Sequence, residues 1–153
     1  MAEFHKKFEV DNKKYFEYLE NLLEESPSVE DLIHQFPVFV GSVNLARFLT
    51  LYEVYNQTKN ISGDILDIGT WKGFSFFTFV KLIKIFEPYT ATQVHCMDSF
   101  EGMNKSEEYL QNLTGSSNKY DECSEELTKK LLELQGLDGI GIVNRLNIID
   151  DLE

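Results

Sequence analysis

The first sixty residues alternate apolar and polar positions with the spacing of amphipathic helices. A second helix is predicted after Ser28, whose side chain can cap it, and Pro37 is expected to close it. A third helix is predicted to begin with Ser42 as its cap and to end before residue 60. The first predicted helix, residues 12–25, gathers these apolar side chains on one face: Phe16, Leu19, Leu22 and Leu23.

After Gly63 the pattern changes to short β-favouring runs separated by helical ones. The run DILDI, residues 64–68, predicts a strand that stops at Gly69. Apolar side chains then cover most of a helix from Gly73 to Phe86, which Pro88 ends. The remaining expected elements are a strand over residues 92–100, a helix over 121–135 and a strand over 139–149.

Strands that alternate with helices predict a parallel sheet with right-handed crossovers. The expected fold class is therefore α/β: a Rossmann-like parallel sheet with crossover helices and a helical N-terminal extension. The extension is expected over residues 1–62 and the sheet portion over residues 63–153, in one domain overall. The sequence is expected to stop just past the third strand.

Charge and apolar content narrow the classes of function. The formal net charge of −12 argues against nucleic acid as a partner, because nucleic-acid affinity rests on clustered Lys and Arg. No apolar stretch reaches membrane-spanning length, and the N-terminus lacks the features of a secretory signal, so we expect a cytoplasmic protein. Cys96 and Cys123 share no metal-ligand spacing and are expected to be reduced thiols.

The turn between the first strand and the helix after it is a candidate ligand site. A parallel strand that leads through a tight loop into a helix N-terminus creates a crevice with exposed amides. A dinucleotide fingerprint would need glycine where Trp71 and Phe74 stand, and no phosphate-binding Gly-Lys-Ser/Thr sequence is present. The turn therefore fits neither of these two ligand classes.

Two motifs at successive strand ends point to a family. The first is acid-x-Gly-x-x-x-Gly, present as Asp67, Gly69 and Gly73, and the second is DSFEG, residues 98–102. Together they resemble class I S-adenosylmethionine-dependent methyltransferases. Within that class the chain is similar to the macrocin O-methyltransferase family, which carries a bulky residue where Trp71 stands. The resemblance runs from about residue 36 to the C-terminus.

The resemblance implies S-adenosylmethionine as cofactor and assigns roles to residues. A carboxylate with two acceptor oxygens suits the two ribose hydroxyls. From the residues alone, an alternative stays open: Asp67 and Asp98 form turns. In the same alternative, Trp71 and Phe100 pack in the core. The implied contacts are Gly69, Thr70, Trp71 and Gly73 around the methionine portion, Asp67 near its amino group, Asp98 on the ribose, Ser99 and Phe100 beside the nucleoside, and Asp150 near the adenine amine.

Methyl transfer to a hydroxyl also needs a held acceptor and a base or metal that removes its proton. In the resembled family those groups lie on and after the fourth strand, so no catalytic or metal-binding residue is assigned here. A divalent metal is compatible with a full-length enzyme, although this sequence identifies no ligands for one. The chain is then either the front portion of a larger enzyme or a minimal unit that binds cofactor without completing catalysis.

The predicted function is that of an S-adenosylmethionine-dependent methyltransferase acting on the hydroxyl of a small-molecule substrate. The alternative is a non-catalytic interaction module that retains the methyltransferase fold. The resemblance places the first strand in the middle of the sheet, so without a fourth strand its edge is left unpaired. We therefore expect a two-fold homodimer that covers this edge, with the N-terminal helix as a competing cover within one chain.

Overall fold

The computed structural model describes residues 2–25, 27–102 and 124–147. The chain divides into two compact units, Met1–Thr50 and Leu51–Glu153. The expected boundary between residues 62 and 63 rests on sequence pattern alone and stays a prediction. In the parts of the chain that the structure describes, no helix has the length and apolar character needed to cross a membrane.

The first unit is helical, as the amphipathic pattern predicts. It contains α1 (Ala2–Glu24), α2 (Val29–His34), α3 (Phe36–Phe39) and the first half of α4 (Ser42–Thr58). α1 begins at Ala2, before the predicted start at residue 12. Residues 2–11 contain no Gly or Pro, so nothing in them stops a helix from extending.

α2 is capped as predicted, but Pro37 plays a different part from the one expected. The Asp31 N–H donates to Ser28 Oγ over 3.0 Å, which satisfies one of the free amides of the first turn. α2 ends at His34, and Pro37 lies in the first turn of α3. The prediction that Pro37 closes the helix was wrong, because a first-turn residue donates no intrahelical hydrogen bond and proline is tolerated there.

The start of α4 is set by Gly41 rather than by a Ser42 cap. Leu45 N–H donates to Gly41 O over 3.0 Å, which puts Gly41 in the cap position and Ser42 inside the helix. A Cβ at Gly41 would run into the ring of Tyr15 on α1. The predicted cap was therefore one residue late. Glycine is also tolerated at a cap position, and the close approach of α1 leaves no room there for a side chain. The predicted end of this helix before residue 60 is confirmed.

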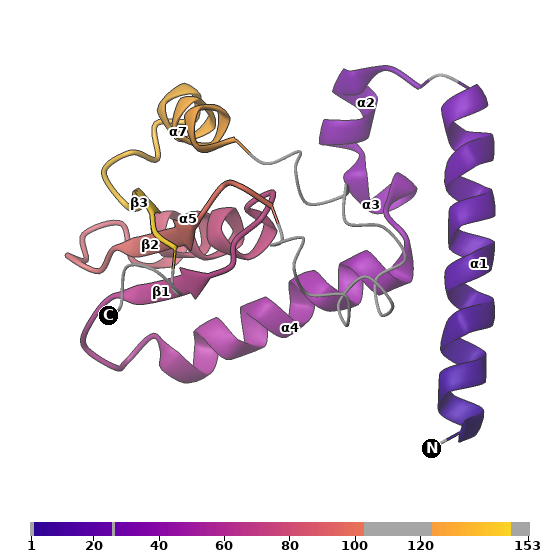
Figure 1. Cartoon of the computed structure of the whole chain (residues 1–153), viewed down its shortest axis with the longest axis horizontal. Helices are drawn as coiled ribbons and strands as arrows, with labels where there is room; N and C mark the ends of the chain where they lie inside the picture. Colours follow the sequence, from indigo (N-terminus) through magenta and orange to yellow (C-terminus); the bar gives the residue numbers. More distant parts are fainter. Residues whose placement is uncertain (1, 26, 103–123, 148–153) are drawn as a thin grey trace. The chain divides into compact units, whose positions relative to one another are not determined.

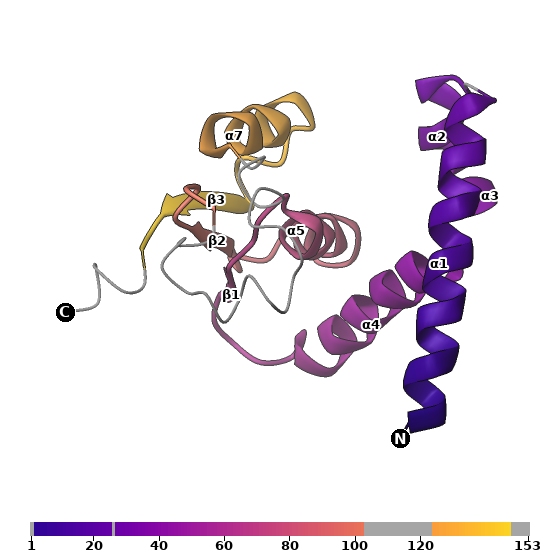
Figure 2. The same cartoon turned by 45° about the vertical axis from the view of Figure 1, so that its right-hand side comes forward.

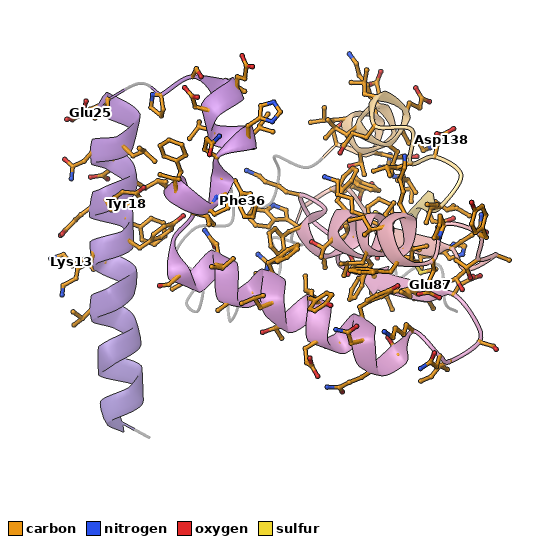
Figure 3. All side chains as sticks on the ribbon, turned by 180° about the vertical axis from the view of Figure 1, so that it is seen from behind. Lys13, Tyr18, Glu25, Phe36, Glu87 and Asp138 are labelled. Atoms are coloured by element: carbon orange, nitrogen blue, oxygen red, sulfur yellow. The ribbon has the colours of Figure 1, made fainter. Side chains whose placement is uncertain are left out.

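Tyrosines on α1 hold the first unit together. The Tyr15 hydroxyl accepts a hydrogen bond from Asn44 Nδ2 at the start of α4, over 2.7 Å. The Tyr18 hydroxyl donates to the Phe39 carbonyl at the end of α3, over 3.2 Å. Figure 3 shows Tyr18 on the side of α1 that faces this segment.

The second unit contains the predicted parallel sheet. Its strands are β1 (Ile65–Ile68), β2 (Val94–Asp98) and β3 (Gly141–Arg145), in the spatial order β1-β2-β3. α5 (Phe74–Phe86) follows β1, and α7 (Glu125–Leu134) precedes β3. Each strand lies within its predicted run, and the α/β fold class with crossover helices is confirmed (Figure 1).

Both of these helices pack on the same face of the sheet, as Figure 2 also shows. A Cβ on Gly141 of β3 would lie 2.8 Å from Leu132 Cδ2 of α7 and 3.0 Å from Phe76 Cζ of α5. Val94 and Cys96 of β2 are fully buried on this face. The opposite face differs, because Leu66 and Ile68 of β1 remain 56% and 58% exposed.

Candidate functional site

The two predicted acids lie at neighbouring carboxyl ends of the sheet. Asp67 of β1 is paired in register with Cys96, and Asp98 is the last residue of β2. Gly69 N–H donates to the Met97 carbonyl over 2.8 Å, so the loops that follow both strands begin side by side. In parallel sheets this edge is where ligands bind.

The loop after β1 turns sharply into α5. Gly69 and Gly73 have φ of 72° and 83°, which glycine adopts without a steric penalty. The Gly73 N–H donates to the Thr70 carbonyl over 2.9 Å, and Thr70 Oγ1 donates to the Asp67 carbonyl over 2.7 Å. A Cβ at Gly73 would lie 2.9 Å from the Phe77 ring, whereas one at Gly69 would meet no atom of the described residues within 4 Å. The backbone at Gly69 is thus open to close approach by a ligand.

Trp71 is unusual because it adopts φ of 51°, in the left-handed region, without being glycine. This conformation costs a non-glycine residue about 1–2 kcal/mol. It directs the Trp71 N–H to Oδ2 of Asp98, over 2.8 Å. The strained residue therefore connects the loop after β1 with the end of β2.

Asp98 binds the loops on both sides. Its Oδ2 accepts the Trp71 N–H, and its Oδ1 accepts the Phe100 N–H over 2.9 Å. Phe100 also has a positive φ, 55°. Because each carboxylate oxygen offers about two acceptor positions, the contacts among the described residues leave one on each for a ligand hydroxyl. The same side chain can thus hold the loops and accept two further hydrogen bonds.

Asp67 is also held by a residue that the sequence prediction did not include. Ser75, in the first turn of α5, donates from Oγ to Asp67 Oδ2 over 3.0 Å. The available signal was a hydroxyl residue two positions after Gly73, at the start of the predicted helix. That Ser75 binds Asp67 could not be predicted, because the contact depends on the path of the loop between them.

The loop after β2 borders a cavity of about 480 Å³. Phe100 lines it and packs against the core, while Ser99 Oγ accepts the Glu101 N–H over 3.3 Å within the turn. Arg145 at the end of β3 lies 2.6 Å from Glu101 and also lines the cavity. Both charged side chains are exposed, so their ion pair adds little stability.

A second cavity, of about 420 Å³, lies at the amino end of β1. It is lined by residues at the end of α4, in the segment leading into β1 and near the end of α5. The Tyr55 hydroxyl there donates to Glu87 Oε1 over 2.5 Å. Burial, with the hydrogen bond and negative charge of Glu87, raises the pKa of Tyr55 above its usual value. Figure 3 labels Glu87, just beyond α5.

The structure brings most of the predicted site residues to one edge of the sheet. Asp150 and the polar loop from residue 103 onward lie outside the described residues. Within the described ranges, no group of three or more His, Cys, Asp or Glu side chains is arranged to hold a metal ion. The roles of the predicted residues as ligand contacts stay predictions. Those brought together are Asp67, Gly69, Thr70, Trp71, Gly73, Asp98, Ser99 and Phe100.

A parallel sheet with crossover helices on one face and acids at its carboxyl edge defines a Rossmann-like ligand-binding fold. The macrocin O-methyltransferase (TylF) family model matches residues 15–138. The chain belongs to this family, which confirms the family predicted from the two motifs. The match begins earlier than the expected start near residue 36, and it ends at residue 138 rather than at the C-terminus. A comparison with curated protein sequences gave no significant match.

Solved structures of a methyltransferase share the fold. The crystal structure of CalS11, a calicheamicin methyltransferase, has 18% sequence identity and a TM-score of 0.72. It aligns with 92% of this chain and 59% of its own. The apo structure of CalS11, described as a TDP-rhamnose 3′-O-methyltransferase, has 19% identity and a TM-score of 0.63, over 92% of this chain and 57% of its own. This chain thus spans less than two thirds of the structures that it resembles.

Proposed function

We propose that this chain binds S-adenosylmethionine at the carboxyl edge of β1 and β2, and that it forms the cofactor-binding part of an O-methyltransferase. The observation that carries the proposal is Asp98, which accepts the Trp71 and Phe100 amides on separate oxygens. This arrangement orients a carboxylate with one remaining acceptor position on each oxygen. Two vicinal hydroxyls, such as those of a ribose, match that pair of acceptors.

The loop after β1 suits the amino-acid end of the same ligand. Gly69 presents open backbone, and the Asp67 carboxylate lies nearby to attract a positively charged amino group. A ligand that extends from Asp67 to Asp98 would therefore carry an ammonium at one end and a hydroxylated sugar near the other. S-Adenosylmethionine has this order of groups.

The acceptor is proposed to be a hydroxyl on a sugar or another small molecule. CalS11 is described as acting on TDP-rhamnose at its 3′ position, which favours a sugar hydroxyl for a relative of the same fold. We assign no base or metal ligand, because the resembled family carries these groups on and after its fourth strand. The cytoplasm is the proposed location.

Calorimetry with S-adenosylhomocysteine tests cofactor binding. We expect the wild-type chain to bind and Asp98→Ala to weaken binding by about 1–3 kcal/mol, because buried hydrogen-bonding groups lose their partner. Asp138→Ala is the matched control, since it removes an exposed carboxylate in the turn after α7. Circular dichroism and thermal melting establish that each variant is folded.

An absence of heat at millimolar S-adenosylhomocysteine, with the chain folded, would contradict the proposal. It would favour the other candidate, a non-catalytic interaction module that keeps the methyltransferase fold. That candidate predicts that Asp98→Ala leaves all function unchanged apart from stability.

A further inference from the structure

Two hydrogen bonds hold Asp67, one on its main chain and one on its side chain. Its own carbonyl accepts the Thr70 hydroxyl over 2.7 Å, which fixes the main chain where β1 ends. Its Oδ2 accepts the Ser75 hydroxyl over 3.0 Å, which fixes the side chain. Both hydrogen bonds are partly buried, so competition from water is reduced.

Ser75 is free for this role because it does not cap its own helix. The cap position of α5 belongs to Gly73, which has no side chain to bind the first-turn amides. The Ser75 hydroxyl instead reaches back eight residues to Asp67. A serine at this position therefore links the first turn of α5 to the strand end.

We propose that Ser75 is a positioning residue that holds the Asp67 carboxylate ready for the ammonium group of the ligand's amino-acid end. The proposal rests on the cofactor-binding function proposed above. A carboxylate has about four acceptor positions, of which Ser75 occupies one. An oriented side chain loses less rotational freedom on binding, so its interaction with an ammonium is stronger than that of a mobile carboxylate.

Comparing the binding of two ligands distinguishes this positioning role from general support of the fold. S-Adenosylhomocysteine carries the ammonium, whereas 5′-methylthioadenosine keeps the nucleoside and sulfur but lacks the amino-acid end. We expect Ser75→Ala to weaken S-adenosylhomocysteine binding about twofold to tenfold, the range for one hydrogen bond, and to leave 5′-methylthioadenosine binding unchanged. Ser75→Thr, which retains the hydroxyl, should restore most of the affinity.

A double-variant cycle with Asp67→Asn tests whether Ser75 acts through Asp67. If it does, Ser75→Ala causes no further loss in the Asp67→Asn background, because the carboxylate it orients is gone. Thr90→Ala is the control for hydroxyl removal, since Thr90 is exposed in the turn after α5. If Ser75→Ala fails to fold, Ser75→Cys takes its place, because a thiol is a weaker donor of similar size.

The outcomes distinguish the two proposals. Additive losses in the cycle would mean that Ser75 contacts the ligand itself, and equal losses for both ligands would mean that it only supports the loop. Either result overturns the positioning role while the cofactor-binding proposal stands. A folded wild-type chain that binds neither ligand would overturn both.

Discussion

The two faces of the sheet differ in how much of their apolar surface is covered. On one face α5 and α7 meet over Gly141, and Phe76, Val94 and Cys96 are fully buried. On the other face Leu66 and Ile68 of β1 are more than half exposed. Both faces carry apolar side chains, yet within the parts of the chain that the structure describes only one face contributes to the core.

The geometry of the candidate site depends on the covered face alone, whereas a complete parallel sheet also needs cover on its other face. The loop after β1 runs into α5, which packs on the covered face, so the geometry of Asp67 and Asp98 depends on that face. Parallel sheets normally have both faces covered. We therefore expect another polypeptide segment to cover the apolar side chains of β1 that are exposed among the described residues.

The largest effect is expected from a cavity on the covered face. Phe76 of α5 is fully buried, and Phe76→Ala should lower the free energy of unfolding by about 3–5 kcal/mol, measured by urea titration. Ile85→Ala on the same helix is the control, because Ile85 is 66% exposed and should change stability by less than about 0.5 kcal/mol. Similar losses in both variants would contradict the assigned core.

A smaller effect is expected from overpacking the point where the two helices meet. Gly141→Ala places a Cβ 2.8 Å from Leu132 and 3.0 Å from Phe76, and should lower stability by about 1–3 kcal/mol. Gly139→Ala adds the same atom where nothing lies within 4 Å. Thermal melting of the pair measures the difference, and an unchanged melting temperature for Gly141→Ala would show that the helices pack less closely.

The smallest effect on folding is expected on the exposed face, where a change of assembly is expected instead. Leu66→Lys should alter monomer stability by less than about 0.5 kcal/mol, because the side chain is already 56% exposed. If a second copy covers the strand-one side of the sheet, including the exposed face at Leu66, light scattering gives a dimer for the wild type and a monomer for Leu66→Lys. A wild-type mass that stays at 17.7 kDa at high concentration would contradict the dimer and favour cover by the N-terminal helix.

The sequence predicted correctly those features that depend on residues close together in the chain or on the general geometry of parallel sheets. Ser28 was a recognisable cap because its partner, Asp31, lies three residues away. The strand DILDI was recognisable because Gly63 and Gly69 flank it in the sequence. Asp67 and Asp98 were recognisable together because carboxyl ends of neighbouring parallel strands meet at one edge.

Interactions between segments decided the rest. Gly41 accepts the first hydrogen bond of α4 at a point where a ring on α1 leaves no room for a side chain, which no pattern within residues 41–45 reveals. The Trp71 N–H reaches Asp98 because Trp71 adopts a left-handed conformation. That conformation is expected from the sequence for a glycine and not for a tryptophan. Ser75 was missed because its partner lies across a loop, so spacing alone gave no sign of the contact.

Because Cys96 is buried, the reactivity of its thiol reports when the middle strand, β2, opens. Its side chain has 0% exposure, between Asp67 and Val143 in the register of the sheet. A thiol reagent requires access to the sulfur, so labelling has to wait until β2 separates from the helices that cover it. In a Cys123→Ser background, the labelling rate of Cys96 would therefore measure how often this part of the protein opens, without any spectroscopic signal.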